Sequence, residues 1–117
     1  MKPLIVGEAN PYGGDPSYAL WPEPEGASGD RLCRLVMGLR RRTYMVAFDR
    51  VNLFPTAWRG IREARIRAGE LIRQRGSPQV FVLLGTKVRD AFGMRATAPF
   101  SRTAVGITAI AVMVGWR

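Results

Sequence analysis

The sequence has no histidine, a single cysteine and no long apolar segment. Because a disulfide needs two thiols, Cys33 alone excludes an internal disulfide and a cysteine-based metal cluster. The longest uncharged apolar stretch, Ala104 to Trp116, is shorter than the roughly 18 residues that suggest a membrane span. The apolar stretch after Met1 and Lys2 is too short for the core of a secretory signal. We therefore expect a cytoplasmic protein that binds no metal, uses no cofactor and contacts no membrane.

Acidic residues are few and unevenly placed. Residues 1–30 carry five acids and one lysine, whereas residues 31–117 carry seventeen Lys or Arg and only four acids. All but two of the eighteen cations are arginine, whose planar guanidinium matches the geometry of phosphate. A basic body of this kind favours a polyanionic partner, most often nucleic acid. The alternative is that the charge serves solubility or reflects an arginine-rich proteome.

Apolar runs alternate along the chain with segments of helical periodicity. The expected strands are Lys2–Val6, Asp49–Phe54, Gln79–Leu84 and Ile107–Val114, and the expected helices are residues 29–39, Thr43–Phe48, Trp58–Arg75 and Lys87–Phe92. This order implies a parallel sheet with helices on both faces. A chain of 117 residues fits one domain. We predict a single α/β domain over residues 1–117, with three layers (α/β/α) and a four-stranded, mainly parallel sheet.

The first expected helix has a cap and a clear apolar stripe. Ser28 is placed to cap it, and Leu32, Leu35, Val36 and Leu39 share one face. The basic run Arg40, Arg41 and Arg42 follows at its C-terminal end, where cations suit the helix dipole. This run is a candidate for DNA phosphate contacts, and a solvated helix end is the alternative.

Residues 10–29, NPYGGDPSYALWPEPEGASG, form the longest segment without helical or strand periodicity. Eight of its twenty residues are Gly or Pro, which excludes a regular element. It nevertheless carries Tyr12, Tyr18 and Trp21. A long aromatic loop in a small domain is usually functional.

Polar residues follow the ends of three expected strands. Glu8 and Asn10 follow the first strand, Asn52 lies near the end of the second, and Gly85–Thr86 follow the third. In open α/β sheets, ligands bind beyond the carboxyl ends of the strands. The sequence therefore predicts one cleft onto which these positions converge. The alternatives are that Glu8 and Asn10 only cap a turn and that the backbone satisfies Asn52.

These positions also resemble motifs of the uracil-DNA glycosylase superfamily. Gly7-Glu8-Ala9 matches the GEA start of the thermophilic-type family, and Asn10-Pro11-Tyr12-Gly13 is similar to the D-P-Y or N-P-G core of other branches. Further along, and in the family's order, Gly26–Leu32 is similar to the G-x-x-G-x-x-L helix entrance, Val51–Leu53 to the base-reading strand, and Val82–Gly85 to the L-L-G strand.

The resemblance implies a uracil-DNA glycosylase-like fold and a role for each matched residue. Asn10 would hold the attacking water together with Glu8, and Tyr12 would wall a base pocket that begins at Gly7. Asn52 would hydrogen-bond the flipped base, and Trp21 or Tyr18 would stack on it, although plain anchoring of the loop is the alternative for Trp21. The implied reaction is hydrolysis of the N-glycosidic bond of uracil or another altered base in DNA.

The chain departs from the family at its second motif. That motif, H-P-S or a relative, supplies a donor to the leaving base, and this chain has no histidine. The single Cys33 also departs from the branches that carry an iron–sulfur cluster. The domain is thus expected to lack the C-terminal catalytic loop. A non-catalytic nucleic-acid or nucleotide-binding module is the alternative function. A third is a subunit that pairs with another chain, or with itself, through strand 107–114.

Overall fold

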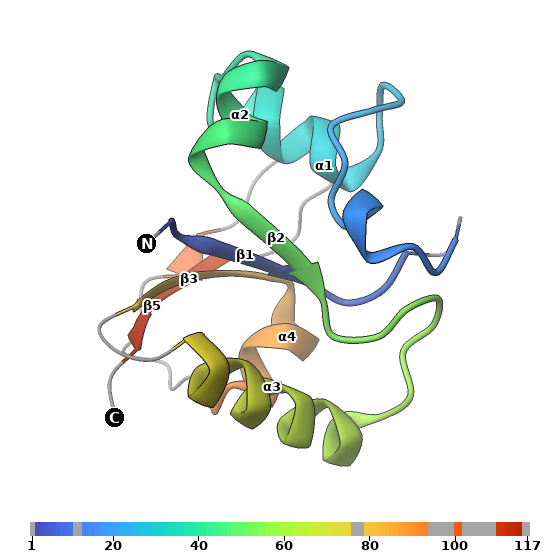
Figure 1. Cartoon of the computed structure of the whole chain (residues 1–117), viewed down its shortest axis with the longest axis vertical. Coiled ribbons are helices and arrows are strands. Elements are labelled where there is room, and N and C mark those ends of the chain that lie inside the picture. Colours follow the sequence, from blue (N-terminus) through green and yellow to red (C-terminus); the bar gives the residue numbers. More distant parts are fainter. Residues whose placement is uncertain (1, 11–12, 76–78, 94–99, 102–109, 116–117) are drawn as a thin grey trace.

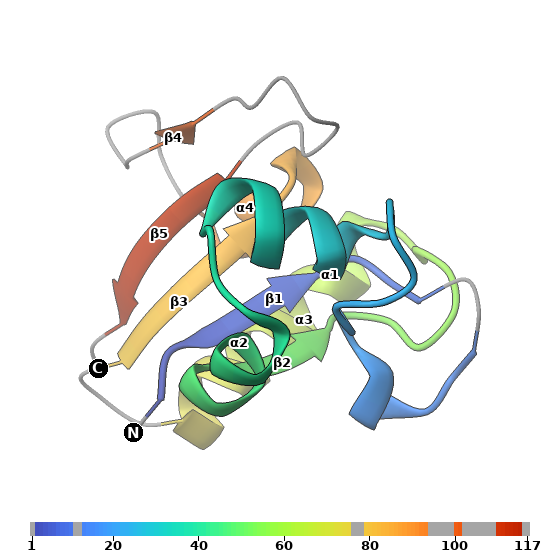
Figure 2. The ribbon, with the colours of Figure 1, turned by 90° about the horizontal axis from the view of Figure 1, so that it is seen from above.

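The computed structural model describes residues 2–10, 13–75, 79–93, 100–101 and 110–115 of the chain. Within these residues a sheet forms from β1 (Leu4–Gly7), β2 (Asp49–Asn52), β3 (Gln79–Leu84), β4 (Phe100–Ser101) and β5 (Ile110–Gly115), in the order β2-β1-β3-β5-β4. Figure 2 shows this order from above the sheet. β1 therefore lies between the two strands that follow it in the chain.

The predicted four-stranded, mainly parallel sheet is wrong in strand number and in direction. β1 pairs in parallel with β2 and with β3, whereas β5 runs antiparallel to β3 and β4 runs antiparallel to β5. The described sheet thus has five strands, of which three are mutually parallel. A continuous apolar run indicates a buried strand but does not carry its direction, because direction depends on the partner that the connecting chain allows. Within the described residues, β4 pairs with β5 at Ile110 and Ala111, so this end of β5 is not a free edge.

Helices cover both faces of the sheet, which confirms the predicted α/β class. The helical elements are the 3₁₀ turn η1 (Pro16–Tyr18), α1 (Ser28–Asp30), the π-helical η2 (Arg31–Val36), α2 (Arg41–Ala47), α3 (Ile61–Arg75) and α4 (Thr86–Ala91). In Figure 1, α1 and α2 lie on one side of the sheet and α3 and α4 on the other.

Two apolar cores separate these layers, and the alternation of the strands assigns each residue to one of them. Leu4 and Val6 of β1 face α3 and α4, where they join Phe54, Phe81 and other buried residues. Ile5 points to the opposite face and packs with Leu32, Cys33, Tyr44, Val82 and Leu84. Successive side chains of a strand point to opposite faces, so a strand that is apolar throughout serves both cores.

The helix predicted over residues 29–39 ends earlier, at Val36, and most of it is a π-helix, which has more residues per turn than an α-helix. α1 starts at Ser28, with Ala27 as the N-cap residue and no side-chain capping bond, so the prediction that Ser28 caps the helix is wrong. The chain then widens into η2, where Met37 N–H donates to Leu32 O. Leu32 and Cys33 are buried, while Leu35 and Val36 are exposed. The wider π turn changes the angle between successive residues, so the stripe of an ideal α-helix no longer faces the sheet.

The basic run Arg40–Arg42 was predicted at the C-terminal end of the helix 29–39. It lies instead at the N-terminal end of the next helix, α2. Arg40 is the N-cap residue of α2, and Arg41 and Arg42 are in its first turn. Cations at a helix N-terminus are unfavourable to the dipole. Arg41 is compensated by ion pairing with Glu23 at 3.2 Å.

Candidate functional site

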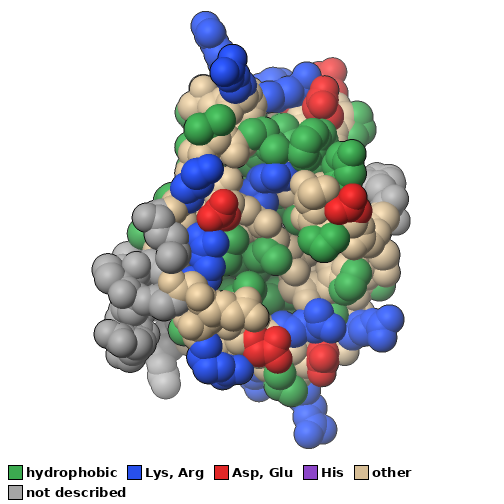
Figure 3. Space-filling view, in the orientation of Figure 1, with side chains coloured by type: hydrophobic (Ala, Val, Ile, Leu, Met, Phe, Trp, Pro, Cys, Tyr) green, Lys and Arg blue, Asp and Glu red, His purple; other side chains and the backbone are tan. Residues whose placement is uncertain are grey.

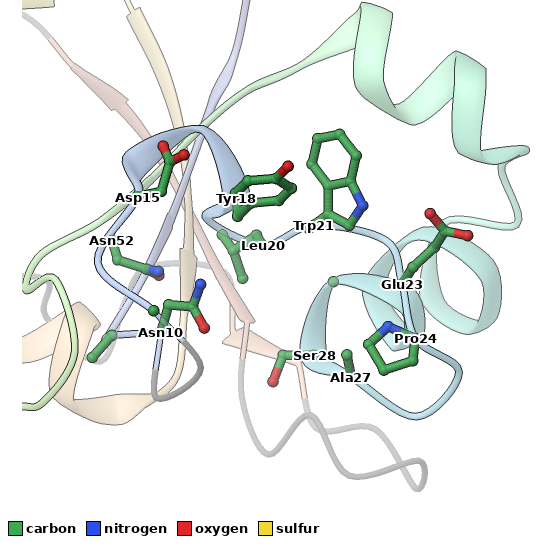
Figure 4. Close-up of a pocket in the computed structure, with 13 residues that line it drawn as sticks. Asn10, Asp15, Tyr18, Leu20, Trp21, Glu23, Pro24, Ala27, Ser28 and Asn52 are labelled. Atoms are coloured by element: carbon green, nitrogen blue, oxygen red, sulfur yellow. The ribbon is translucent and has the colours of Figure 1, made fainter.

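A cavity of about 340 Å³ opens beyond the carboxyl ends of β1 and β2. Segment 13–29 forms its other wall. Figure 4 shows the lining side chains. The polar and aromatic ones are Asn10, Asp15, Tyr18, Trp21, Glu23 and Asn52. This space is called the main cavity below. It lies at the carboxyl end of β1, which has the parallel strands β2 and β3 on its two sides. That is the usual position of a ligand in α/β sheets.

Asn52 reaches the main cavity because Gly7 has no side chain. The two residues are register partners at the ends of β2 and β1. A Cβ atom on Gly7 would overlap Asn52 Oδ1 and would lie 3.2 Å from a Leu20 methyl group. In the described part of the chain, the Asn52 side chain makes no hydrogen bond to protein. Its amide is therefore available to a ligand.

Asn10 is held at the same end of the sheet by its backbone. Its N–H donates to Pro55 O at 3.1 Å, and its carbonyl accepts from Gly13 N–H at 3.3 Å. The first bond ties the chain after β1 to the chain after β2. Figure 4 shows the Asn10 and Asn52 side chains on the same side of the cavity. Two amides that follow adjacent parallel strands thus line one space.

Three side chains from other elements hold the wall formed by segment 13–29. Arg50 of β2 donates to Ala19 O at 2.8 Å and to Ser17 O at 3.4 Å. The Tyr44 hydroxyl of α2 donates to Leu20 O at 2.8 Å. Arg41 donates to Pro22 O at 3.1 Å. The loop is irregular, but four of its carbonyls between Ser17 and Pro22 accept hydrogen bonds from these side chains.

Tyr18 and Trp21 supply the aromatic surface of the main cavity. Their ring centroids are 5.0 Å apart with an interplanar angle of 60°, an edge-to-face pair. The Arg50 guanidinium lies 5.4 Å from the Trp21 ring centroid. Leu20, which lies between Tyr18 and Trp21 in the chain, has a φ of 52°. This left-handed conformation is strained for a bulky side chain. Such strain persists only where the surroundings hold it, as Tyr44 does here through the Leu20 carbonyl.

A second cavity of about 190 Å³ adjoins the first and shares Asn10, Asp15 and Asn52 with it. Arg67 of α3 lines it. The Arg67 guanidinium donates to Leu53 O at 3.1 Å and lies 5.0 Å from the Phe54 ring centroid. Arg67 is the one cation among the described residues that line either cavity.

The structure brings together only part of the residue set expected from the sequence. Asn10, Trp21 and Asn52 line the main cavity, and Gly7 lies directly beneath Asn52. Glu8 lines neither cavity. Its Oε1 atom lies 3.5 Å from the position that a Cβ on Gly85 would take, which directs the carboxylate towards the end of β3.

Of the remaining expected site residues, the structure describes only the basic run Arg40–Arg42. Tyr12 lies outside the described residues, so its predicted place in the pocket wall is not described. The basic run Arg40–Arg42 does not line the main cavity; Arg40 and Arg42 are exposed, and Arg41 binds the loop. Contact with DNA phosphate therefore stays a prediction for Arg40 and Arg42. The guanidinium of Arg41 already binds the loop through Pro22 O.

Sequence reasoning missed Asp15 and Glu23 as lining residues and Tyr44 and Arg50 as supports of the loop. The acidic bias of residues 1–30 was a usable signal, because acids confined to an aromatic loop of a basic chain need an explanation. No local signal points to Tyr44 or Arg50, since their partners are backbone carbonyls 24 and 31 residues away.

Within the described residues, no three His, Cys, Asp or Glu side chains gather as a metal site would require. The helices of that same part include none with the length and apolarity needed to cross a membrane. Comparison with protein-family models, with curated proteins and with solved structures finds no match to this chain. The uracil-DNA glycosylase resemblance thus stays a prediction based on short motifs, and the fold and cavity are described on their own terms.

Proposed function

We propose that this protein is a DNA base-excision glycosylase that binds an altered base in the main cavity and hydrolyses its N-glycosidic bond. The observation that carries the proposal is the pair of amides, Asn10 and Asn52, that line one cavity of about 340 Å³ with Trp21. The finer assignment to a uracil-DNA glycosylase-like fold belongs to the same proposal. It is supported by the order of the motifs along the chain and by the position of the cavity at the ends of β1 and β2.

The proposed chemistry assigns one task to each lining group. Asn52 hydrogen-bonds the edge of the base, since an amide offers both a donor and an acceptor. Tyr18 and Trp21 pack against the ring, as aromatic side chains do with flipped or unpaired bases. Asn10 orients a water towards the sugar carbon as the glycosidic bond breaks. Because that transition state resembles an oxocarbenium ion, a positioned water suffices and a strong base is not required.

The basic exterior supports DNA as the source of the base. Figure 3 shows Lys and Arg side chains spread around one face of the molecule, with Asp and Glu between them. Arg40 and Arg42 of α2 are exposed, as are Arg62 and Arg65 of α3. Such a distribution attracts a polyanion without defining a sequence, which suits an enzyme that selects a base by extrusion.

The test is release of free base from uracil-containing single-stranded and duplex oligonucleotides, measured by chromatography. Asn10→Ala and Asn52→Ala should each reduce the rate by about 100-fold or more, the usual cost of one positioned transition-state group. Gln74→Ala is the matched control, because Gln74 carries an exposed amide on α3 away from both cavities. If neither asparagine variant changes the rate of base release, the reaction does not take place in this cavity.

Two observations favour a second function, a base-binding module that does not cleave. The Glu8 carboxylate lies outside the main cavity, and the described lining residues include no Lys, Arg or His to stabilise a departing anionic base. In that case nucleosides would bind and Asn52→Ala would weaken the binding, yet no oligonucleotide would release a base. Calorimetric titration with nucleosides beside the release assay separates the two functions.

A further inference from the structure

The main cavity is locally acidic in a strongly basic chain. Its described lining includes the carboxylates of Asp15 and Glu23 and no Lys, Arg or His, whereas the whole chain has a formal net charge of +9. The cavity wall therefore repels phosphate and favours a ligand that is neutral or positively charged.

Most carboxylates of segment 15–30 already have a cationic partner. Glu23 pairs with Arg41 at 3.2 Å. Arg34 pairs with Asp30 at 3.0 Å and with Glu25 at 3.7 Å. Three of the four acids in the segment are thus compensated within the protein.

Asp15 is the exception among these four. In the described part of the chain the only hydrogen bonds to its carboxylate come from Ser17, whose N–H and hydroxyl donate to Oδ1 at 3.0 and 2.8 Å, and no Lys or Arg pairs with this carboxylate. The bond from the Ser17 backbone, followed by that from its hydroxyl, lowers the pKa of Asp15 below its ordinary value of 3.8. Asp15 stays ionised near neutral pH, and its charge is left for a ligand.

The aromatic part of the wall also suits a cation. The Arg50 guanidinium already lies 5.4 Å from the Trp21 ring centroid, and Tyr18 is 51% exposed. Aromatic faces attract cations through their quadrupole, most strongly where solvent is partly excluded. Aromatic rings combined with an uncompensated carboxylate are a suitable environment for a positively charged ring.

A positively charged base also removes the need for a Lys, Arg or His beside the leaving base, and the described lining of the main cavity includes none of these. A neutral base such as uracil leaves as an anion, which needs donors or cations beside it. When the ring carries an N-alkyl group and a positive charge, the C1′–N bond breaks and its electron pair neutralises the ring. The oxygen of water then bonds to C1′, and its proton passes to solvent.

We propose that the main cavity selects a positively charged, N-alkylated base, such as 7-methylguanine, over uracil. This inference rests on the proposed function in that it takes a base as the occupant. Asp15 is the residue that sets the preference, with Tyr18 and Trp21 as the surface that the charged ring contacts.

The first experiment compares 7-methylguanosine with guanosine by titration calorimetry at mildly acidic pH, where the methylated ring is cationic. The wild-type protein should bind the methylated nucleoside about tenfold more tightly or better. Asp15→Asn should bring the two affinities to within about threefold. Asn caps a turn as well as Asp does, so η1 is retained and circular dichroism should be unchanged. Glu25→Gln, which removes a charge from the same loop but not from the cavity, should keep the preference. Equal affinities in the wild type would overturn the inference.

The second experiment measures base release from matched oligonucleotides that carry 7-methylguanine or uracil, each corrected for spontaneous loss. Faster enzymatic release of the methylated base, reduced in Asp15→Asn, supports the inference. Release of uracil alone would overturn it while leaving the proposed glycosylase intact. A calorimetric preference without any release would keep the selectivity and reject hydrolysis. Absence of both binding and release would reject both proposals.

Discussion

At the scale of single residues, the absence of a side chain is what allows the main cavity to form. Gly7 makes room for Asn52, and Gly29 lets the start of α1 approach the backbone of the loop. A Cβ atom on Gly29 would overlap the carbonyl oxygens of Leu20 and Trp21. These contacts are with backbone, which cannot turn away as the end of a side chain can.

Replacing Gly29 by Ala should therefore be destabilising, by about 1–3 kcal/mol, the usual cost of overpacking. Gly69→Ala is the matched control, and it should have the opposite effect on the free energy of unfolding. Gly69 lies inside α3, where an added Cβ would meet only Arg73 at an ordinary 3.5 Å. The gain in helix propensity should stabilise the protein by about 0.5–1 kcal/mol. Urea unfolding measures both, and equal effects of the two substitutions would contradict this account.

At the scale of elements, the loop wall owes its shape to neighbouring elements rather than to its own sequence. Arg50 of β2 and Tyr44 of α2 bind its carbonyls, and the Tyr44 ring is fully buried. Leu20 keeps its left-handed φ under this restraint. The wall should therefore loosen when one of these holding bonds is removed, with the sheet intact.

Tyr44→Phe tests that expectation. The substitution leaves the Leu20 carbonyl without its 2.8 Å donor, so the free energy of unfolding should fall by about 1–2 kcal/mol. Binding in the main cavity should weaken as well, because Leu20 and Trp21 line it. Val46→Ala, a change at an exposed site on α2, is the comparison, and it should leave both quantities nearly unchanged. An unaltered stability of Tyr44→Phe would show that the hydroxyl does not restrain the loop.

The turn that begins α1 should make stability depend on pH. Asp30 is buried, and the hydrogen bond from Arg34, followed by that from Gly26 N–H, lowers its pKa below 3.8. Because the pKa is lower in the folded state, the stabilisation is complete above 3.8 and is lost as the pH falls through the folded value. Thermal unfolding from neutral pH downwards should show this loss, with a smaller loss in Asp30→Asn. Identical acid profiles for the two proteins would assign the loss to other groups.

At the scale of the whole molecule, charge is separated between an acidic cavity and a basic exterior. Of the eighteen cations, seventeen lie in residues 31–117. In the proposed function, the basic exterior attracts the DNA backbone and the acidic cavity admits the base. The proposal thus assigns attraction of DNA and selection of the base to different parts of the surface.

DNA affinity should consequently fall steeply with salt. Between about 50 mM and about 200 mM salt, a loss of tenfold or more is expected from release of counterions. Arg40→Ala and Arg42→Ala should each weaken binding and reduce the salt slope by about one. Glu70→Gln, a change at an exposed acid of α3, should not reduce the slope. Fluorescence anisotropy with a labelled oligonucleotide measures these quantities, and an affinity independent of salt would exclude phosphate contacts.

The pattern of residues was sufficient to predict most elements and the place of the cavity. The apolar runs at Leu4–Gly7 and Gln79–Leu84 and the periodicity of Ile61–Arg75 are local properties, and all three elements form. The cleft followed from strand ends alone, since Gly7 and Asn52 do end adjacent parallel strands. Which side chains point into that cleft was less predictable, as the direction of the Glu8 carboxylate towards the end of β3 illustrates.

The sequence by itself determined the α/β class, the two-faced burial of β1 and β3 and the convergence of Asn10 and Asn52, because each depends on local periodicity or on strand ends. Only the tertiary structure decided the antiparallel direction of β5, the π turn at Arg31–Val36 and the acidic wall of the cavity. The direction of β5 depends on its pairing with β3, and the loop wall depends on bonds between distant segments, such as Tyr44 with Leu20 and Arg41 with Glu23. Local patterns carry no record of such partners, since the bonds form with backbone atoms or side chains that only folding brings near.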